Sequence, residues 1–279
     1  MTEVVTVQVA LPIPTWYRDH RLDGRTVLPA VEAMALLVGS AREKRLTVGV
    51  NQIQQAEFTR FVHLADAVTQ LEATLEFSPT RDNRLRARLL TRKRFKSICR
   101  MVYHCELLLW RDAHPPTPSL QPAAAPPLDA LVLEAEQIYR ELVPFGPAYR
   151  TLCGQVYLTG RTALATVRGP DLPVTEPALG SPFCLDGAMH AACVHGQRLV
   201  DFVPFPVAFT SRSIFQPTRP AEGYRVEVQL QRAEARELLY DLSLWDATGR
   251  LSEKVDGLRM RDVSSGRIRP PDWIRNSGP

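Results

Sequence analysis

The chain has 279 residues, of which 45% are hydrophobic and 23% are charged, and its formal net charge is +4. These values are typical of a globular protein with one large domain or two smaller ones. No uninterrupted apolar stretch reaches the roughly 20 residues that a membrane-spanning helix requires, so we expect no membrane span.

The first ten residues, MTEVVTVQVA, predict a strand and lack the basic segment that begins a secretory signal. The cysteines are odd in number and show no C-x-x-C spacing, which argues against a disulfide framework or a zinc site. We therefore expect buried free thiols in a reducing cytoplasm, and no metal. These cysteines are Cys99, Cys105, Cys153, Cys184 and Cys193.

A helix and then a series of strands are predicted in the first half. Residues 30–45 carry apolar side chains at helical spacing, on one face formed by Val31, Met34, Ala35 and Val38. Alternating segments rich in β-formers follow, and we expect strands over residues 46–62, 67–77, 84–95 and 97–110.

The run RLRARLLTRKRFKSICR, residues 84–100, is strongly basic. Its charges alternate with apolar residues at a period of about two, which favours a strand with one solvated face. A docking face for an acidic protein partner is the second interpretation. Nucleic acid is the third and least favoured, so we expect no nucleic-acid partner.

A proline-rich segment, HPPTPSLQPAAAPPL, predicts a linker over residues 114–128, because it can neither pair in a sheet nor continue a helix. It separates an N-terminal unit, 1–113, from a C-terminal unit, 129–265, which is followed by a tail, 266–279. In the second unit we expect helices over 128–142 and 183–196 and strands over 153–160, 162–169, 205–216, 224–233, 237–246 and 252–262.

Each half thus combines a helix with a run of antiparallel strands. Since helices do not alternate with single strands, a doubly wound parallel sheet is disfavoured, and an α+β tandem duplication is predicted.

The first candidate site motif is H-x3-G-x4-P, formed by His20, Gly24 and Pro29. Glycine permits a close approach of the backbone, and free amides before a helix start favour an oxyanion. A histidine beside such donors could remove a proton while the donors hold the developing charge. A surface histidine before an ordinary helix is the alternative.

The second motif is P-x3-D-x3-H, formed by Pro182, Asp186 and His190. The i, i+4 spacing puts the aspartate and the histidine on one helix face within hydrogen-bonding reach. Their neighbours are apolar, so we expect desolvation to raise the pKa of Asp186 and keep it able to donate a proton. An acidic residue favoured by the helix dipole is the alternative.

Two apolar segments complete the set. Phe145-Gly146-Pro147-Ala148-Tyr149 predicts a turn that leads into a strand, and residues 202–217 suit a tunnel lining or a buried strand. Core packing is the alternative for both.

Taken in chain order, H-x3-G-x4-P, F-G-P-x-Y, P-x3-D-x3-H and then the apolar segment 202–217, the four segments resemble the dehydratase domains of modular polyketide synthases, over nearly the whole chain from Val4 to Val263. The resemblance implies a double hotdog fold, in which two α+β units share a sheet and each wraps it around a central helix. Because no ketosynthase, reductase or carrier segment is present, we expect either a free-standing protein that acts in trans or an excised domain, and the Met1 start and the composition favour the former.

The resemblance also implies roles for individual residues. His20 matches the catalytic base and Asp186 the catalytic acid, while His190 positions the acid and the Gly24 amide binds the thioester carbonyl. We expect the same motifs to bind substrate through Pro29, Phe145, Gly146, Pro147, Tyr149, Pro182 and Phe205. Two positions depart from the family: Phe145 stands where a tyrosine is usual, and Ser181 where a histidine is usual.

The implied reaction is loss of water from a β-hydroxyacyl thioester on an acyl carrier protein, without a cofactor. Implied partners are that carrier and other polyketide synthase components, and a homodimer is typical of the family. A double-bond isomerase or cyclase and a catalytically silent carrier-binding scaffold remain as alternatives. An (R)-specific enoyl-CoA hydratase is disfavoured, because its Asp and His lie close together in one motif.

Overall fold

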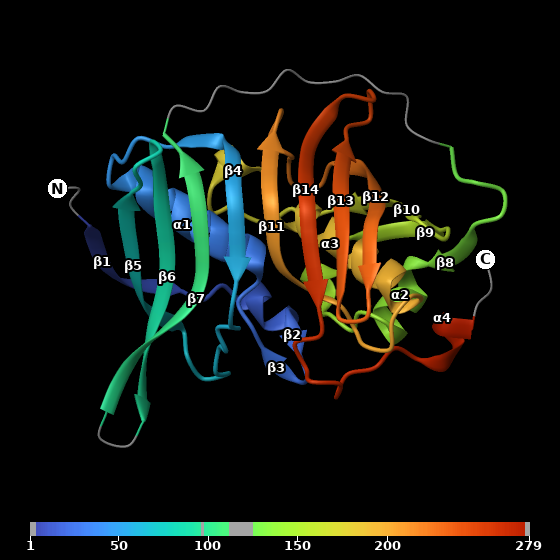
Figure 1. The fold of residues 1–279 in the computed structure, drawn as a ribbon, viewed down its shortest axis with the longest axis horizontal. Coiled ribbons are helices and arrows are strands. Elements are labelled where there is room, and N and C mark those ends of the chain that lie inside the picture. The colour runs from blue at the N-terminus through green and yellow to red at the C-terminus, as the bar shows by residue number, and fades with distance from the viewer. Residues whose placement is uncertain (1–3, 96–97, 112–124, 277–279) are drawn as a thin grey trace.

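The computed structural model describes residues 4–95, 98–111 and 125–276. Within these residues, twelve antiparallel strands form one sheet that wraps around two helices, α1 and α3 (Figure 1). The strand order is β1-β5-β6-β7-β4-β11-β14-β13-β12-β10-β9-β8, so strands from the first half of the chain occupy one side and strands from the second half the other. The predicted α+β class is confirmed.

The first half follows the predicted plan. The single predicted helix is α1, Ala30–Glu43, and each predicted β-rich segment contains a strand. The strands are β1 Val5–Pro12, β4 Gly49–Phe58, β5 Gln70–Pro79, β6 Arg84–Phe95 and β7 Ile98–Trp110. A 3₁₀ helix, η1 Thr15–Asp19, and a small hairpin of β2 Arg21–Leu22 and β3 Arg25–Thr26 connect β1 to α1.

The second half contains one correction. Residues 128–142 were expected to form a single helix, but they form strand β8, Leu131–Glu134, and then the short helix α2, Ala135–Glu141. The residues Leu131, Val132 and Leu133 pair with β9 at the edge of the sheet, and this tertiary pairing outweighs the helical pattern.

The remaining elements are η2 Pro147–Tyr149, β9 Leu152–Leu158, β10 Thr162–Arg168, η3 Pro177–Leu179, α3 Pro182–Gln197, β11 Phe205–Ile214, β12 Gly223–Glu234, β13 Glu237–Trp245, β14 Leu251–Arg261 and α4 Asp272–Asn276. Among them, α3 and the strands β9 to β14 agree with the predicted segments, η2 forms part of the predicted turn, and η3 and α4 were not predicted. Most of the predicted linker, residues 114–124, lies outside the described residues, so the unit boundaries stay a prediction.

Strands β4 and β11 join the two halves of the sheet, with Phe209 opposite Ala56. On the inner face, helix α1 packs against helix α3. Arg42 of α1 donates to the buried carboxylate of Glu176, which belongs to the second half. This contact ties α1 to the segment before α3, and together with the packing of the two helices it joins the halves around the candidate site.

Strand β6 illustrates how the pattern determines the face. Leu85, Ala87 and Leu89 are buried, while the alternating Arg86 and Arg88 pair with Glu106 on the outer side. The solvated-strand interpretation of the basic run is therefore confirmed for this part of it. No helix in the described part of the chain is long and apolar enough to cross a membrane.

Candidate active site

The β2–β3 hairpin positions His20. Strand pairing joins Arg21 to Thr26, and the turn at Asp23 and Gly24 has φ values of 51° and 72°. Such a two-residue turn requires positive φ at both positions, which Gly24 adopts without strain. The hairpin register places His20 opposite Val27, whose amide donates to the His20 carbonyl at 3.0 Å. The spacing of the first motif is thus explained by a hairpin.

The imidazole of His20 has a defined orientation. Its Nδ1 lies 3.1 Å from the carbonyl oxygen of Val27. Because a carbonyl can only accept, Nδ1 carries the hydrogen and Nε2 is left as a free basic nitrogen. Burial lowers the pKa of His20, although the nearby Asp186 opposes this effect. The ring is therefore neutral near pH 7 and suited to accept a proton.

Helix α3 carries the second group. Asp186 and His190 are each 5% exposed, and Nε2 of His190 lies 2.9 Å from Oδ2 of Asp186. The predicted contact across one helical turn is confirmed. Neither atom makes a well-aligned hydrogen bond within the described residues, so the two are in close polar contact without ideal alignment.

The expected pKa of Asp186 is wrong. Burial does raise it, but the charge and hydrogen bonding of His190 and the charge of His20 outweigh that effect, and the net pKa lies below the ordinary value. The expectation gave weight to the apolar neighbours along α3 and too little to His190, which lowers the pKa most, while His20 adds a smaller effect from the other half.

Tyr139 of α2 holds His190 in place, and the sequence analysis missed it. Its hydroxyl oxygen accepts from the amides of Thr151 and Leu152, each at 2.8 Å. Its hydrogen is then free to donate to Nδ1 of His190, 3.2 Å away. This series of hydrogen bonds directs the Nε2–H of His190 toward Asp186. The contact joins residues 51 positions apart, so no local spacing could have revealed it.

The FGPAY turn fixes His20 against the second half. The Gly146 amide donates to the Asp19 carbonyl at 2.8 Å, and the Ala148 amide donates to Oδ2 of Asp19 at 2.9 Å. A Cβ at position 146 would lie 2.4 Å from Oδ1 of Asp19, so only glycine fits. The ring of Phe145 consequently lies between two imidazoles, with centroids 4.4 Å from His20 and 5.0 Å from His190.

His20, Phe145, Asp186 and His190 line one cavity of about 1140 Å³. It is large enough for an extended organic ligand. Residues from both halves line it, and the predicted site residues among them are His20, Gly24, Phe145, Asp186, His190 and Phe205. The remaining predicted residues do not line it. Pro29 and Pro182 start α1 and α3, while Gly146, Pro147 and Tyr149 lie behind His20, with the Tyr149 ring centroid 5.1 Å from the imidazole.

A buried carboxyl on α1 is a second group that the sequence analysis missed. Glu32 is 2% exposed and accepts from the Tyr17 hydroxyl at 2.9 Å and the Thr175 hydroxyl at 3.2 Å. Burial raises its pKa to about 7, and Asp186 contributes to this rise. The only sequence signal was an acidic residue inside a predicted apolar helix.

No group of three His, Cys, Asp or Glu residues in the described ranges is arranged to hold a metal ion. The chemistry that these residues offer is proton transfer. A neutral, partly buried imidazole and a buried carboxyl group line the same cavity from different halves of the chain.

A sequence profile of the polyketide synthase dehydratase N-terminal domain matches residues 112–269. No curated protein matches the chain. Among solved structures, the N-terminal dehydratase of the difficidin assembly line is similar, with 17% identity, a TM-score of 0.73 and coverage of 94% of each chain.

A bifunctional dehydratase-cyclase domain from ambruticin biosynthesis shares 20% identity, with a TM-score of 0.66 over 92% of this chain and 91% of that one. A monomeric dehydratase domain from a trans-AT polyketide synthase split module shares 13% identity, with a TM-score of 0.75 over 94% and 100%. At these identities the likeness establishes the fold, which is the double hotdog.

Proposed function

The chain belongs to the polyketide synthase dehydratase family, and on this premise we propose that it removes water from a β-hydroxyacyl thioester carried on an acyl carrier protein. Family membership supports the coarser statement, dehydratase activity on polyketide intermediates. The observation that carries the finer proposal is that His20 and Asp186, from separate halves, line one cavity.

In the proposed reaction His20 is the base. Its neutral Nε2 takes a proton from the carbon next to the thioester carbonyl, while Nδ1 keeps its hydrogen bond to the Val27 carbonyl. The electron pair of the broken C–H bond becomes the new double bond. A base needs a pKa that leaves it unprotonated at the working pH, and burial of His20 meets this need.

Asp186 is the proposed acid. It protonates the β-hydroxyl group as the C–O bond breaks, so that the oxygen leaves as water. Because the pKa of Asp186 is lowered in the free protein, we propose that Asp186 takes up its proton together with the substrate. The acyl chain displaces water from the cavity, and desolvation then favours the neutral carboxyl group.

Gly24 and Phe145 have proposed supporting roles. Gly24 lines the cavity at the turn of the β2–β3 hairpin, which suits a backbone amide that donates a hydrogen bond to the thioester carbonyl oxygen. Phe145 separates the two imidazoles and offers an apolar wall in place of the tyrosine hydroxyl usual in the family. Neither role requires a cofactor.

The test is the mass of a 3-hydroxyacyl carrier-protein thioester after incubation with the protein. We expect the loss of one water, or its addition when the reaction starts from the unsaturated thioester. His20→Ala and Asp186→Asn should each abolish this change while leaving the melting curve nearly intact. A folded wild-type protein that binds the carrier but leaves the mass unchanged would point instead to a scaffold or an isomerase.

Two matched variants control for general damage to the cavity. His63→Ala and Asp23→Asn alter a histidine and an aspartate that also line the cavity but lie outside the proposed pair. Both should retain turnover close to that of the wild type. Equal losses in all four variants would contradict the assignment of the base and the acid.

A further inference from the structure

The hairpin of β6 and β7 extends beyond the rest of the sheet (Figure 1). Pairing between β5 and β6 ends at Leu90, and pairing between β4 and β7 ends at Cys105. The strand residues 91–95 and 98–102 pair only with each other. We call this two-stranded ribbon the basic arm.

The charged residues of the basic arm are all positive. From Thr91 to Val102 the sequence has five Lys or Arg residues and no Asp or Glu. In the ribbon, Lys93 lies directly opposite Arg100, an arrangement of like charges that destabilises a strand pair. Arg92, Arg94 and Arg100 form no ion pair with any residue that the structure describes. The repulsion between these like charges therefore destabilises the ribbon.

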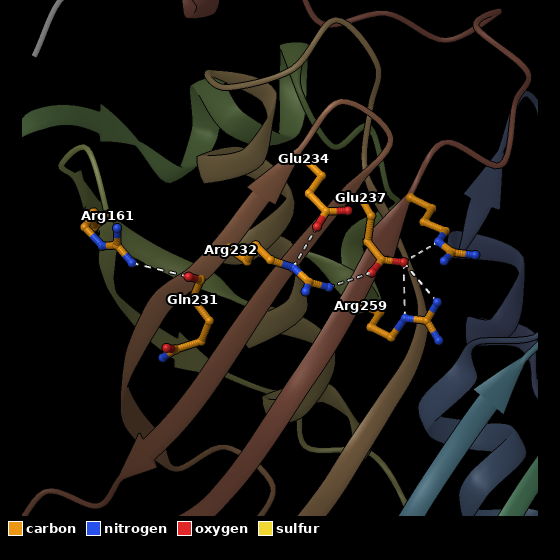
Figure 2. A network of polar contacts seen from close by, with 7 residues as sticks. Arg161, Gln231, Arg232, Glu234, Glu237 and Arg259 are labelled. Atoms are coloured by element: carbon orange, nitrogen blue, oxygen red, sulfur yellow. Dashed lines mark hydrogen bonds and ion pairs between the residues drawn. The ribbon is translucent and has the colours of Figure 1, made fainter.

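Another arginine cluster of the molecule is compensated. On β12, β13 and β14, Glu237 pairs with Arg232, Arg259 and Arg261, and Arg232 also pairs with Glu234 (Figure 2). The arginines nearer the start of β6 share Glu106 in the same way. Arg92, Arg94 and Arg100 of the basic arm differ from these groups, because they have no ion pair with any described residue.

The base of the basic arm is part of the cavity wall. Thr91, Arg92, Lys93 and Val102 line the cavity that contains His20 and Asp186. Further along, Ile98 is 55% exposed and Met101 is 44% exposed. Any protein held on the arm would therefore lie next to the cavity, and it would meet both positive charge and apolar side chains.

We propose that the basic arm docks the acidic protein that carries the acyl thioester. Docking there places the thioester-bearing group of that carrier at the cavity. This inference rests on the proposed function. Charge complementarity over a surface of this kind speeds encounter and fixes orientation. A nucleic acid would also be attracted by positive charge, but continuity with the cavity favours a partner that delivers a small reacting group.

The test compares one acyl group on two carriers. The substrates are 3-hydroxyhexanoyl thioesters of an acidic acyl carrier protein and of free pantetheine. The variant is Arg94→Glu with Arg100→Glu, since both residues are exposed and neither lines the cavity. We expect the KM for the carrier-bound substrate to rise roughly tenfold or more. For the pantetheine thioester, kcat and KM should stay unchanged.

A charge-matched control uses the opposite end of the sheet. Arg81 and Arg250 are exposed in the β5–β6 and β13–β14 turns. Arg81→Glu with Arg250→Glu should leave both KM values unchanged, and the neutral Arg94→Gln with Arg100→Gln should give an intermediate effect. An equal KM for the carrier-bound substrate in wild type and arm variant would overturn the proposal.

A binding measurement keeps the inference separate from the proposed function. The anisotropy of a labelled, unloaded acidic carrier reports docking without turnover. If neither thioester is dehydrated but the arm variant loses carrier binding, the proposed function fails and the docking surface stands. Unchanged carrier binding overturns the inference. The inference is also overturned if the arm variant loses binding to a labelled RNA duplex but keeps carrier binding. It is likewise overturned if the variant only self-associates, because the charges would then serve to prevent pairing between ribbon edges.

Discussion

Glu32 provides a quantitative test of the electrostatics of the buried site. Burial raises the pKa of this carboxyl from its ordinary 4.5 to about 7, and its side chain is 2% exposed. Between these two pH values the folded state holds a proton that the unfolded state has released. Rising pH therefore lowers the free energy of unfolding, and this decrease is complete above about pH 7. The raised pKa corresponds to about 3 kcal/mol of unfolding free energy.

The perturbation is Glu32→Gln, which keeps the shape and an acceptor for Tyr17 and Thr175 but cannot ionise. We expect the unfolding free energy of the wild type, relative to this variant, to fall by about 2 to 3 kcal/mol between about pH 5 and about pH 8. Urea denaturation at a series of pH values measures this difference. Glu43→Gln, an exposed position on the same helix, is the control and should show no such trend.

A difference between wild type and Glu32→Gln that stays flat with pH would refute the reasoning. It would mean that Glu32 ionises in the folded protein as readily as in the unfolded chain. The influence of Asp186 on Glu32 would then have to be abandoned as well.

Two further predictions concern the contacts that position the site. Tyr139→Phe removes the acceptor of two buried amides, so we expect the unfolding free energy to fall by about 2 to 4 kcal/mol, and turnover to fall more than in a variant of equal stability; a stable, fully active variant would exclude the role of Tyr139. Gly146→Ala places a Cβ 2.4 Å from Asp19 and should lower both the melting temperature and kcat, whereas Gly160→Ala, with nothing within 4 Å of the new Cβ, should change neither.

The parts of the fold that follow from local patterns were predictable from the sequence. Strand β6 alternates buried Leu85 with paired Arg86 because one face meets the core and the other meets water. Residues 131–134 did not follow their helical pattern, because pairing with β9 at the sheet edge decides their structure. Strand edges are set by tertiary contacts, which a local pattern does not contain.

The candidate site divides in the same way. The contact between Asp186 and His190 lies within one helical turn, so its spacing alone predicted it. The support of His190 by Tyr139 and the clamp of Asp19 on Gly146 join residues far apart in the chain. The pKa of Asp186 is lowered mainly by His190 on the same helix, and His20 adds a smaller effect from the other half.

The most direct test of the central claim is a crystal structure of Asp186→Asn with a 3-hydroxyacyl pantetheine thioester bound. The account predicts that the thioester lies in the cavity between the halves, with its α-carbon beside Nε2 of His20 and its β-hydroxyl group beside residue 186. An acyl chain bound elsewhere, or one whose α-carbon is turned away from His20, would contradict the account.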